Sequence, residues 1–126
     1  MLPPSLLIID PNLHFSRAAA KYLLNFPEVE KVDLAADTDE AFLVICARKP
    51  DVLLVDYDYY VSDAKVKVLC EKMIERFPET LIIALTLYTI ELDCDLLPAA
   101  EPVGWIISKQ DFAEGLFALF DLPLIS

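Results

Sequence analysis

Short apolar runs alternate along this chain with longer segments of helical period. Five of the runs are predicted to be strands: Ser5–Ile9, Lys31–Ala35, Val52–Val55, Leu81–Leu85 and Gly104–Ile107. The first, third and fourth runs are apolar at nearly every position, as strands buried on both faces must be. The alternation predicts an α/β fold, namely a doubly wound, five-stranded parallel sheet with helices on both faces.

Helices are predicted in the segments that separate these strands. Their ranges are Phe15–Asn25, Thr38–Arg48, Ala64–Phe77 and Gln110–Phe120, with a less well defined stretch near Ile90–Ala99. A proline closely follows each of the first three ranges, and its ring cannot continue a helical hydrogen-bond ladder. No internal repeat or linker interrupts the sequence, so residues 1–126 are expected to form a single domain.

The balance of charge argues against one class of partner. Ten Lys and Arg residues stand against 21 Asp and Glu residues, which gives a formal net charge of −11. Such a chain repels phosphate backbones, so we expect no direct nucleic-acid binding by this segment. The apolar runs are interrupted well short of the ~18 residues that a membrane-spanning helix needs, and no basic stretch precedes one of them. We expect a soluble, cytoplasmic protein without a membrane partner.

The cysteines point to no disulfide framework. Cys46, Cys70 and Cys94 are odd in number and widely spaced, in apolar surroundings. That spacing also matches no zinc site. We expect all three to be small buried hydrophobic residues.

Polar residues follow the predicted strands where chemistry is expected in this fold. In a doubly wound sheet the functional crevice lies outside the carboxyl ends of the strands. Asp10, Asp56 and Thr86 follow or end the first, third and fourth strands, and Ser108 with Lys109 closes the fifth. Two carboxylates, a hydroxyl and an ammonium group at one edge could hold a divalent cation and the oxygens of a phosphoryl group.

These residues and their spacing resemble the receiver domain of two-component response regulators, of the chemotaxis-regulator type, over essentially the whole chain. The resemblance implies a flavodoxin-like receiver topology. It matches Asp56 to the phosphoacceptor aspartate, which a histidine kinase would phosphorylate, and Thr86 to the hydroxyl residue that contacts the phosphoryl group. It places Trp105 at the aromatic switch position.

The chain also departs from the receiver pattern. Pro11 follows Asp10 where the family usually has a second acid, so Mg²⁺ binding is expected to be weakened, because ligand charge holds such a hard cation. Ser108 stands at the position of the family lysine. Lys109 comes one residue later, which on a strand reverses the face of the side chain unless a bulge intervenes. Asp58 is a candidate substitute metal ligand, in a bulky loop of residues 57–60.

The last predicted helix carries an unusually broad apolar surface. Its apolar residues are Phe112, Leu116 and Leu119 on one stripe, with Phe117 and Phe120 at neighbouring angles. A helix of this kind would leave aromatic surface exposed in an isolated domain. We therefore predict that Trp105, Phe112, Leu116, Phe117 and Phe120 contribute to a homodimer or dock on a partner. The alternative is that residues 121–126 fold back and cover the helix.

Two functions follow from the resemblance. The first is an atypical receiver that serves as a protein-interaction module, with an impaired phosphoacceptor pocket around Asp56. The second is an active Mg²⁺-dependent receiver that a histidine kinase phosphorylates on Asp56. Neither is an enzyme, and either could precede an effector domain in a longer protein. A flavin- or nucleotide-binding protein is a remote alternative, because no glycine-rich phosphate loop follows the first strand.

Overall fold

The computed structural model describes residues 1–87, 96–99 and 102–120. Its strands are β1 (Ser5–Ile9), β2 (Lys31–Ala35), β3 (Val52–Asp56), β4 (Leu81–Thr86), β5 (Leu96–Pro98) and β6 (Trp105–Ser108). Its helices are α1 (Leu13–Leu23), α2 (Thr38–Arg48), α3 (Tyr57–Ser62), α4 (Ala64–Arg76) and α5 (Phe112–Phe120). No helix in these ranges has the length and apolar character needed to cross a bilayer.

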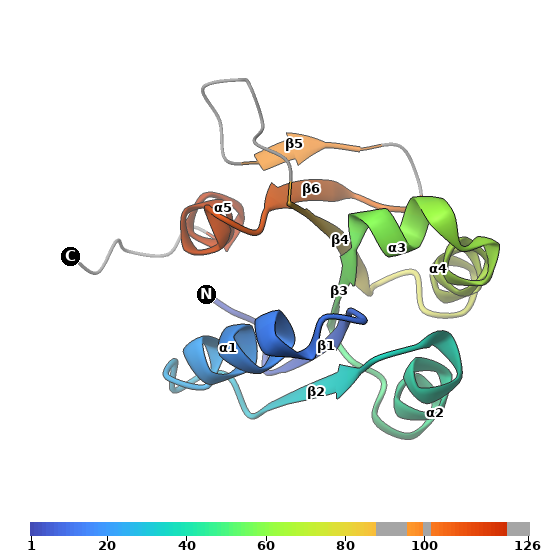
Figure 1. Cartoon of the computed structure of the whole chain (residues 1–126). Coiled ribbons are helices and arrows are strands. Elements are labelled where there is room, and N and C mark those ends of the chain that lie inside the picture. The colour runs from blue at the N-terminus through green and yellow to red at the C-terminus, as the bar shows by residue number, and fades with distance from the viewer. Residues whose placement is uncertain (88–95, 100–101, 121–126) are drawn as a thin grey trace.

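The strands form one sheet in the order β2-β1-β3-β4-β6-β5 (Figure 1). Every neighbouring pair is parallel except β5 and β6, which are antiparallel. The prediction of a doubly wound sheet with five parallel strands is therefore confirmed, and β5 adds a short antiparallel strand at its edge.

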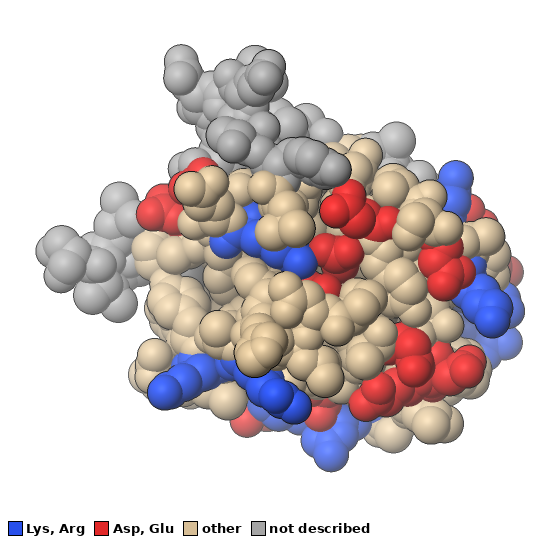
Figure 2. Space-filling model, viewed as in Figure 1, with Lys and Arg blue, Asp and Glu red and all other residues tan. Residues whose placement is uncertain are grey.

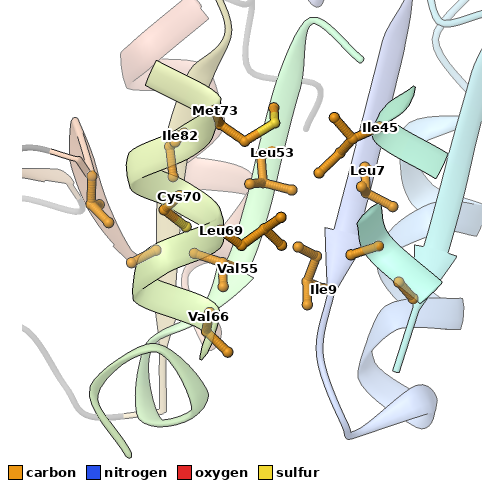
Figure 3. Packing of buried hydrophobic residues seen from close by; sticks show 14 residues of the cluster. Leu7, Ile9, Ile45, Leu53, Val55, Val66, Leu69, Cys70, Met73 and Ile82 are labelled. Atoms are coloured by element: carbon orange, nitrogen blue, oxygen red, sulfur yellow. The ribbon is translucent and has the colours of Figure 1, made fainter. Parts of the chain in front are cut away.

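The helices α1 and α5 cover one face of the sheet, and α2, α3 and α4 cover the other (Figure 1). Leu6 and Ile8 of β1 point into the core beneath α1 and α5, whereas Leu7 and Ile9 point into the core beneath α2 and α4. Figure 3 shows this second core, where the side chains of Leu53 and Val55 meet those of the flanking helices. The alternation follows from the period of two along a strand, and it explains why the central strands are apolar at every position.

Short polar side chains decide where the helices begin. The Asn12 side chain accepts hydrogen bonds from the backbone N–H groups of His14 and Phe15, and so caps α1. The Asp37 carboxylate caps α2 by accepting from the N–H of Glu40 at 2.9 Å. Such caps satisfy amides that the first turn leaves without an intrahelical partner.

Two local predictions are wrong. The segment near Ile90–Ala99 was expected to be helical, but Leu96–Pro98 pairs with β6; residues 90–95 lie outside the described part of the chain. A strand edge offers unpaired backbone groups, and proline is tolerated on an edge strand. The expected loop 57–60 belongs to α3 instead, because the Asp56 carboxylate caps that helix through the Tyr59 N–H at 2.9 Å.

Of the two described cysteines, one is buried as expected and the other is not. Cys70 of α4 is fully buried, and burial raises the pKa of its thiol to about 12. Cys46 of α2 is exposed, contrary to the prediction. Its apolar sequence neighbours include Phe42 and Leu43, which are exposed as well. Cys94 lies outside the described residues.

The stability of the core should be sensitive to the truncation of one buried side chain. Leu53→Ala, at a fully buried position in the central strand β3, is expected to lower the free energy of unfolding by about 2–5 kcal/mol. Leu24→Ala, at an exposed position, should change it by less than about 0.5 kcal/mol. Urea unfolding followed by circular dichroism measures both. Equal losses in the two variants would contradict this account of the core.

The two described cysteines should differ in reactivity. In a Cys94→Ser background at mildly alkaline pH, we expect a thiol reagent to label Cys46 rapidly and Cys70 only on unfolding, because the thiolate is the reactive form. Mass spectrometry of the native and the urea-unfolded protein identifies the labelled residue. A Cys46→Ser variant that still takes up the reagent rapidly in the native state would show that the burial of Cys70 is wrong.

Candidate functional site

The carboxyl ends of the parallel strands bring the predicted site residues to one edge of the sheet. Asp10 directly follows β1, Asp56 ends β3 and Thr86 ends β4. Lys109 comes directly after β6, whose last residue is paired in register with Thr86. The side chains of all four residues belong to the buried polar set of the protein.

Three of these side chains form an ion triad, defined here as Asp10, Asp56 and Lys109. The Lys109 Nζ lies 2.6 Å from Asp10 Oδ2 and 2.8 Å from Asp56 Oδ1. The exposed fractions of the three side chains are 3% for Asp10, 11% for Asp56 and 5% for Lys109. Two buried carboxylates at such a distance from one cation are held together by it, because either would be costly to bury unpaired.

The second oxygen of each carboxylate is bound to the backbone. Asp10 Oδ1 accepts from the Asn12 N–H at 2.8 Å, just before α1 begins. Asp56 Oδ2 accepts from the Tyr59 N–H at 2.9 Å in the first turn of α3. Each aspartate therefore uses one oxygen for Lys109 and the other to fix the chain that follows its own strand.

Lys109 reaches the triad because β6 ends one residue before it. Its backbone N–H donates to the Thr86 carbonyl at 2.7 Å, while the Ser108 hydroxyl accepts from the Gln110 N–H at 3.2 Å. The regular alternation of side chains along β6 thus ends at Ser108, and it does not turn the Lys109 side chain to the other face of the sheet. The concern that Lys109 comes one residue too late for the pocket does not apply to this structure.

The environment of Lys109 keeps its ammonium charged. Burial by itself lowers the pKa of this group, but the hydrogen bonds to Asp10 and Asp56 and the charges of these carboxylates outweigh burial and raise the pKa above its ordinary value of 10.5. The ammonium also lies 4.7 Å from the centre of the Phe15 ring, which provides a cation–π contact.

The position of Lys109 also changes which residue of β6 matches the aromatic switch position. As matched to this chain, the receiver pattern puts the switch aromatic three positions before the lysine position, and three positions before Lys109 stands Ile106. Trp105 packs in the core beneath α1 and α5, whereas Ile106 packs on the opposite face with Tyr57 and Tyr60 of α3. The switch role of Trp105 stays a prediction, and Ile106 is the side chain of β6 that faces α3.

The three predicted metal ligands do not form one set. Within residues 1–87, 96–99 and 102–120, no three His, Cys, Asp or Glu side chains are placed to hold a metal ion. Asp58 is half-buried on α3 and does not join Asp10 and Asp56. The donor set at this edge is thus two carboxylates that already share an ammonium.

The predicted interface around α5 is smaller than expected. Phe112 and Leu116 are buried in the core, and Phe117 and Phe120 are half-buried. The outer edge of β6, which carries Trp105, is paired with β5. Residues 121–126, the alternative cover for this helix, lie outside the described part of the chain.

Removing the cation of the triad should destabilise the protein. Lys109→Met leaves two buried carboxylates facing each other, so we expect a loss of about 3–5 kcal/mol in the free energy of unfolding at neutral pH. Lys67→Met, at an exposed position on α4, serves as the control and should change little. The free energy is measured by urea unfolding, and a loss no larger than that of Lys67→Met would exclude the triad as a stabilising feature.

The ion triad should also make the free energy of unfolding depend on pH. Because the folded pKa of Lys109 is raised, its contribution is complete below the ordinary value of 10.5 and is lost as the pH rises through the folded pKa. The wild type should therefore lose stability at high pH by a component that Lys109→Met lacks. Unfolding curves of both proteins between about pH 9 and 12 measure the difference.

Part of the sequence is similar to known proteins. No family model matches the sequence. The chain is 36% identical over 76 residues to the oxygen regulatory protein NreC of Staphylococcus carnosus, which covers 60% of this chain and 35% of that protein. It is 31% identical over 78 residues to a protein-glutamate methylesterase/protein-glutamine glutaminase of Methanospirillum hungatei, which covers 62% of this chain and 23% of that protein. The matches thus span about a third or less of these relatives.

A solved structure has the same fold over nearly its whole length. The receiver domain of the histidine kinase CKI1 from Arabidopsis thaliana, complexed with Mg²⁺ and BeF₃⁻, superimposes with a TM-score of 0.65 at 15% identity, covering 96% of this chain and 93% of that one. The sheet order agrees with the receiver topology that the sequence resemblance implies. The chain therefore has the fold of a receiver domain, and part of its sequence is similar to an oxygen regulatory protein.

Proposed function

We propose that this receiver domain is atypical, and that it acts in two-component signal transduction as a protein-interaction module with an impaired phosphoacceptor pocket. The observation that carries the proposal is the ion triad. Both oxygens of Asp10 and both oxygens of Asp56 already have partners, and Lys109 supplies one of them to each carboxylate. The chain's own ammonium thus offsets one of the two negative charges in the pocket.

The donor set supports weak metal binding at most. The related CKI1 receiver structure contains Mg²⁺ and BeF₃⁻. In this chain Asp10 and Asp56 would hold Mg²⁺, which would supply charge neutralisation for a phosphoryl group. Pro11 contributes no carboxylate, and the cation would compete with Lys109 for the two that remain. A hard cation bound by fewer free charges is bound less tightly.

The partners that fit this proposal are proteins. A histidine kinase or another signalling protein is the expected contact, and direct nucleic-acid binding is not, because the net charge is −11. Figure 2 shows acidic side chains gathered over α2 on the viewed face, where Asp39 and Glu40 lie in the first turn of that helix. We expect no catalysis by this segment. The methylesterase and glutaminase names belong to a protein of which the match covers 23%.

The position of Lys109 favours a second candidate, an active receiver. A phosphoryl group would pass from a kinase histidine to Asp56, with the P–N bond breaking as the new P–O bond forms on a carboxylate oxygen. Lys109, released from Asp56 but held by Asp10, would then lie close to the phosphoryl oxygens, and Thr86 ends the adjacent strand. The two candidates differ in whether the triad opens for the reaction.

Titration with beryllofluoride and Mg²⁺ separates these candidates. We expect no saturable signal from bound beryllofluoride in fluorine NMR, and no change in the fluorescence of the single tryptophan, at millimolar Mg²⁺. A saturable change in the wild type that disappears in Asp56→Asn would overturn the impaired pocket and establish the active receiver. Circular dichroism confirms that both proteins are folded.

Restoring the missing acid provides a matched gain of function. Pro11→Asp places a second carboxylate after Asp10, so it should raise the affinity for Mg²⁺ by about tenfold or more, whereas Pro11→Ala should not. Binding is followed by the tryptophan signal or by calorimetry. Equal affinities in the two variants would show that the acid missing at residue 11 does not limit the pocket.

A further inference from the structure

A groove runs along the outer side of α2 and α4. The two helices lie side by side on one face of the sheet (Figure 1), and in Figure 3 the side chains of Ile45, Leu69 and Met73 meet beneath the space that separates them. The part of the groove nearest the start of both helices has a volume of about 340 Å³, and it continues toward their ends through Phe42 and Lys72.

Large apolar side chains remain exposed beside this groove. Phe42 is 47% exposed and Leu43 is 70% exposed on α2, and Val68 is exposed on α4. Phe42 and Val68 both line the groove, and Leu43 is exposed next to Phe42 on α2. We call Phe42, Leu43 and Val68 the apolar patch of this face. The patch lies on the opposite face of the sheet from α5.

The charges along the groove differ from those of the protein as a whole. Its charged lining consists of Lys65, Lys72 and Arg76 from α4, with Asp39 from α2. The lining is therefore basic, although the chain carries a net charge of −11. A complementary partner must present apolar side chains together with acidic ones.

The ridge of α2 has this composition. Asp39 and Glu40 are exposed in its first turn, and Phe42 with Leu43 project in the next turn. The basic side chains that lie farthest along the groove are Lys72 and Arg76. Asp39 and Glu40 stand with Lys65 at the end of the groove where both helices begin, and the basic residues Lys72 and Arg76 follow toward the other end. The acidic pair of one copy can therefore face Lys72 and Arg76 of a second copy that is turned end for end.

We propose that this face of α2 and α4 binds the same face of a second copy of the chain, with the two α2 helices antiparallel across a two-fold axis. In such an isologous contact the same surface patch of both copies meets itself, so the acidic side chains of each copy face the basic side chains of the other. Asp39 and Glu40 of one copy meet Lys72 and Arg76 of the other. Leu43, the middle residue of Thr38–Arg48, lies next to the axis.

This contact is independent of the state of the acidic pocket. The contact uses no residue of the ion triad. The dimer can therefore be disproved without affecting the proposed signalling function, and the signalling function can be disproved without affecting the dimer. It also differs from the interface predicted from the sequence, which lies on α5 and β6. Variants on the two surfaces therefore distinguish the two dimers.

Sedimentation analysis and light scattering from micromolar to millimolar concentrations test the proposal. We expect the wild type to form dimers as concentration rises, and Leu43→Glu to raise the dimer dissociation constant by about tenfold or more. Phe117→Glu, on α5, is the matched control and should leave the constant unchanged. A dimer lost in Phe117→Glu but kept in Leu43→Glu would overturn the proposal.

Charge reversal tests the pairing itself. Asp39→Lys and Lys72→Glu should each weaken the dimer, because like charges then face one another across the axis, and the double variant should recover it. Failure of the double variant to recover would contradict the antiparallel arrangement. Circular dichroism of each variant establishes that loss of the dimer is not loss of the fold.

Cross-linking locates the axis. In a Cys46→Ser background, Leu43→Cys should form a covalent dimer rapidly on mild oxidation, and Leu24→Cys, exposed at the end of α1, should not. A wild type that stays monomeric at millimolar concentration and a Leu43→Cys variant that does not cross-link would together overturn the second-copy assignment. The basic groove would then suit an acidic amphipathic helix of another protein.

Discussion

The ammonium of Lys109 is the group on which the functional edge of the sheet depends. Two aspartates that follow neighbouring parallel strands are brought together by the register, whatever their charge. Their burial side by side is tolerable because one cation lies within hydrogen-bond distance of both. The strand that precedes this cation, β6, lies three places away from β1 in the sheet, so the triad ties together the ends of three strands.

The triad also fixes the starts of two helices. Asp10 holds the turn before α1, and Asp56 caps α3, each with the oxygen that Lys109 does not use. Any event that pulls Lys109 from Asp56 thus acts on a group that also sets the position of α3. On the other side the ammonium lies over the Phe15 ring, which contacts Phe112 of α5 edge to face at 5.9 Å. Contacts from one buried charge therefore reach helices on both faces of the sheet.

The two faces of the sheet have different surfaces. The helices α1 and α5 pack aromatic side chains against a common core, with Phe112 buried and Phe15, Tyr22 and Phe120 partly buried. The helices α2 and α4 pack their inner stripes just as completely, but they keep Phe42, Leu43 and Val68 exposed over a basic groove. Core packing does not require these outer residues, and the proposed contact between two copies of the chain would cover them.

The fold class, the five parallel strands and the placement of Asp10, Asp56 and Thr86 at one edge could be predicted from the amino-acid sequence, because the period of burial along the chain is a local property. The features that could not be predicted depend on how the elements pack together. The reach of Lys109 depends on where β6 stops against β4, and the side of the sheet that Trp105 faces depends on the same one-residue register. The pairing of Leu96–Pro98 with β6 and the exposure of Cys46 likewise depend on which neighbours are present. A pattern of apolar residues shows that a segment is buried or paired, and the packed structure shows against what.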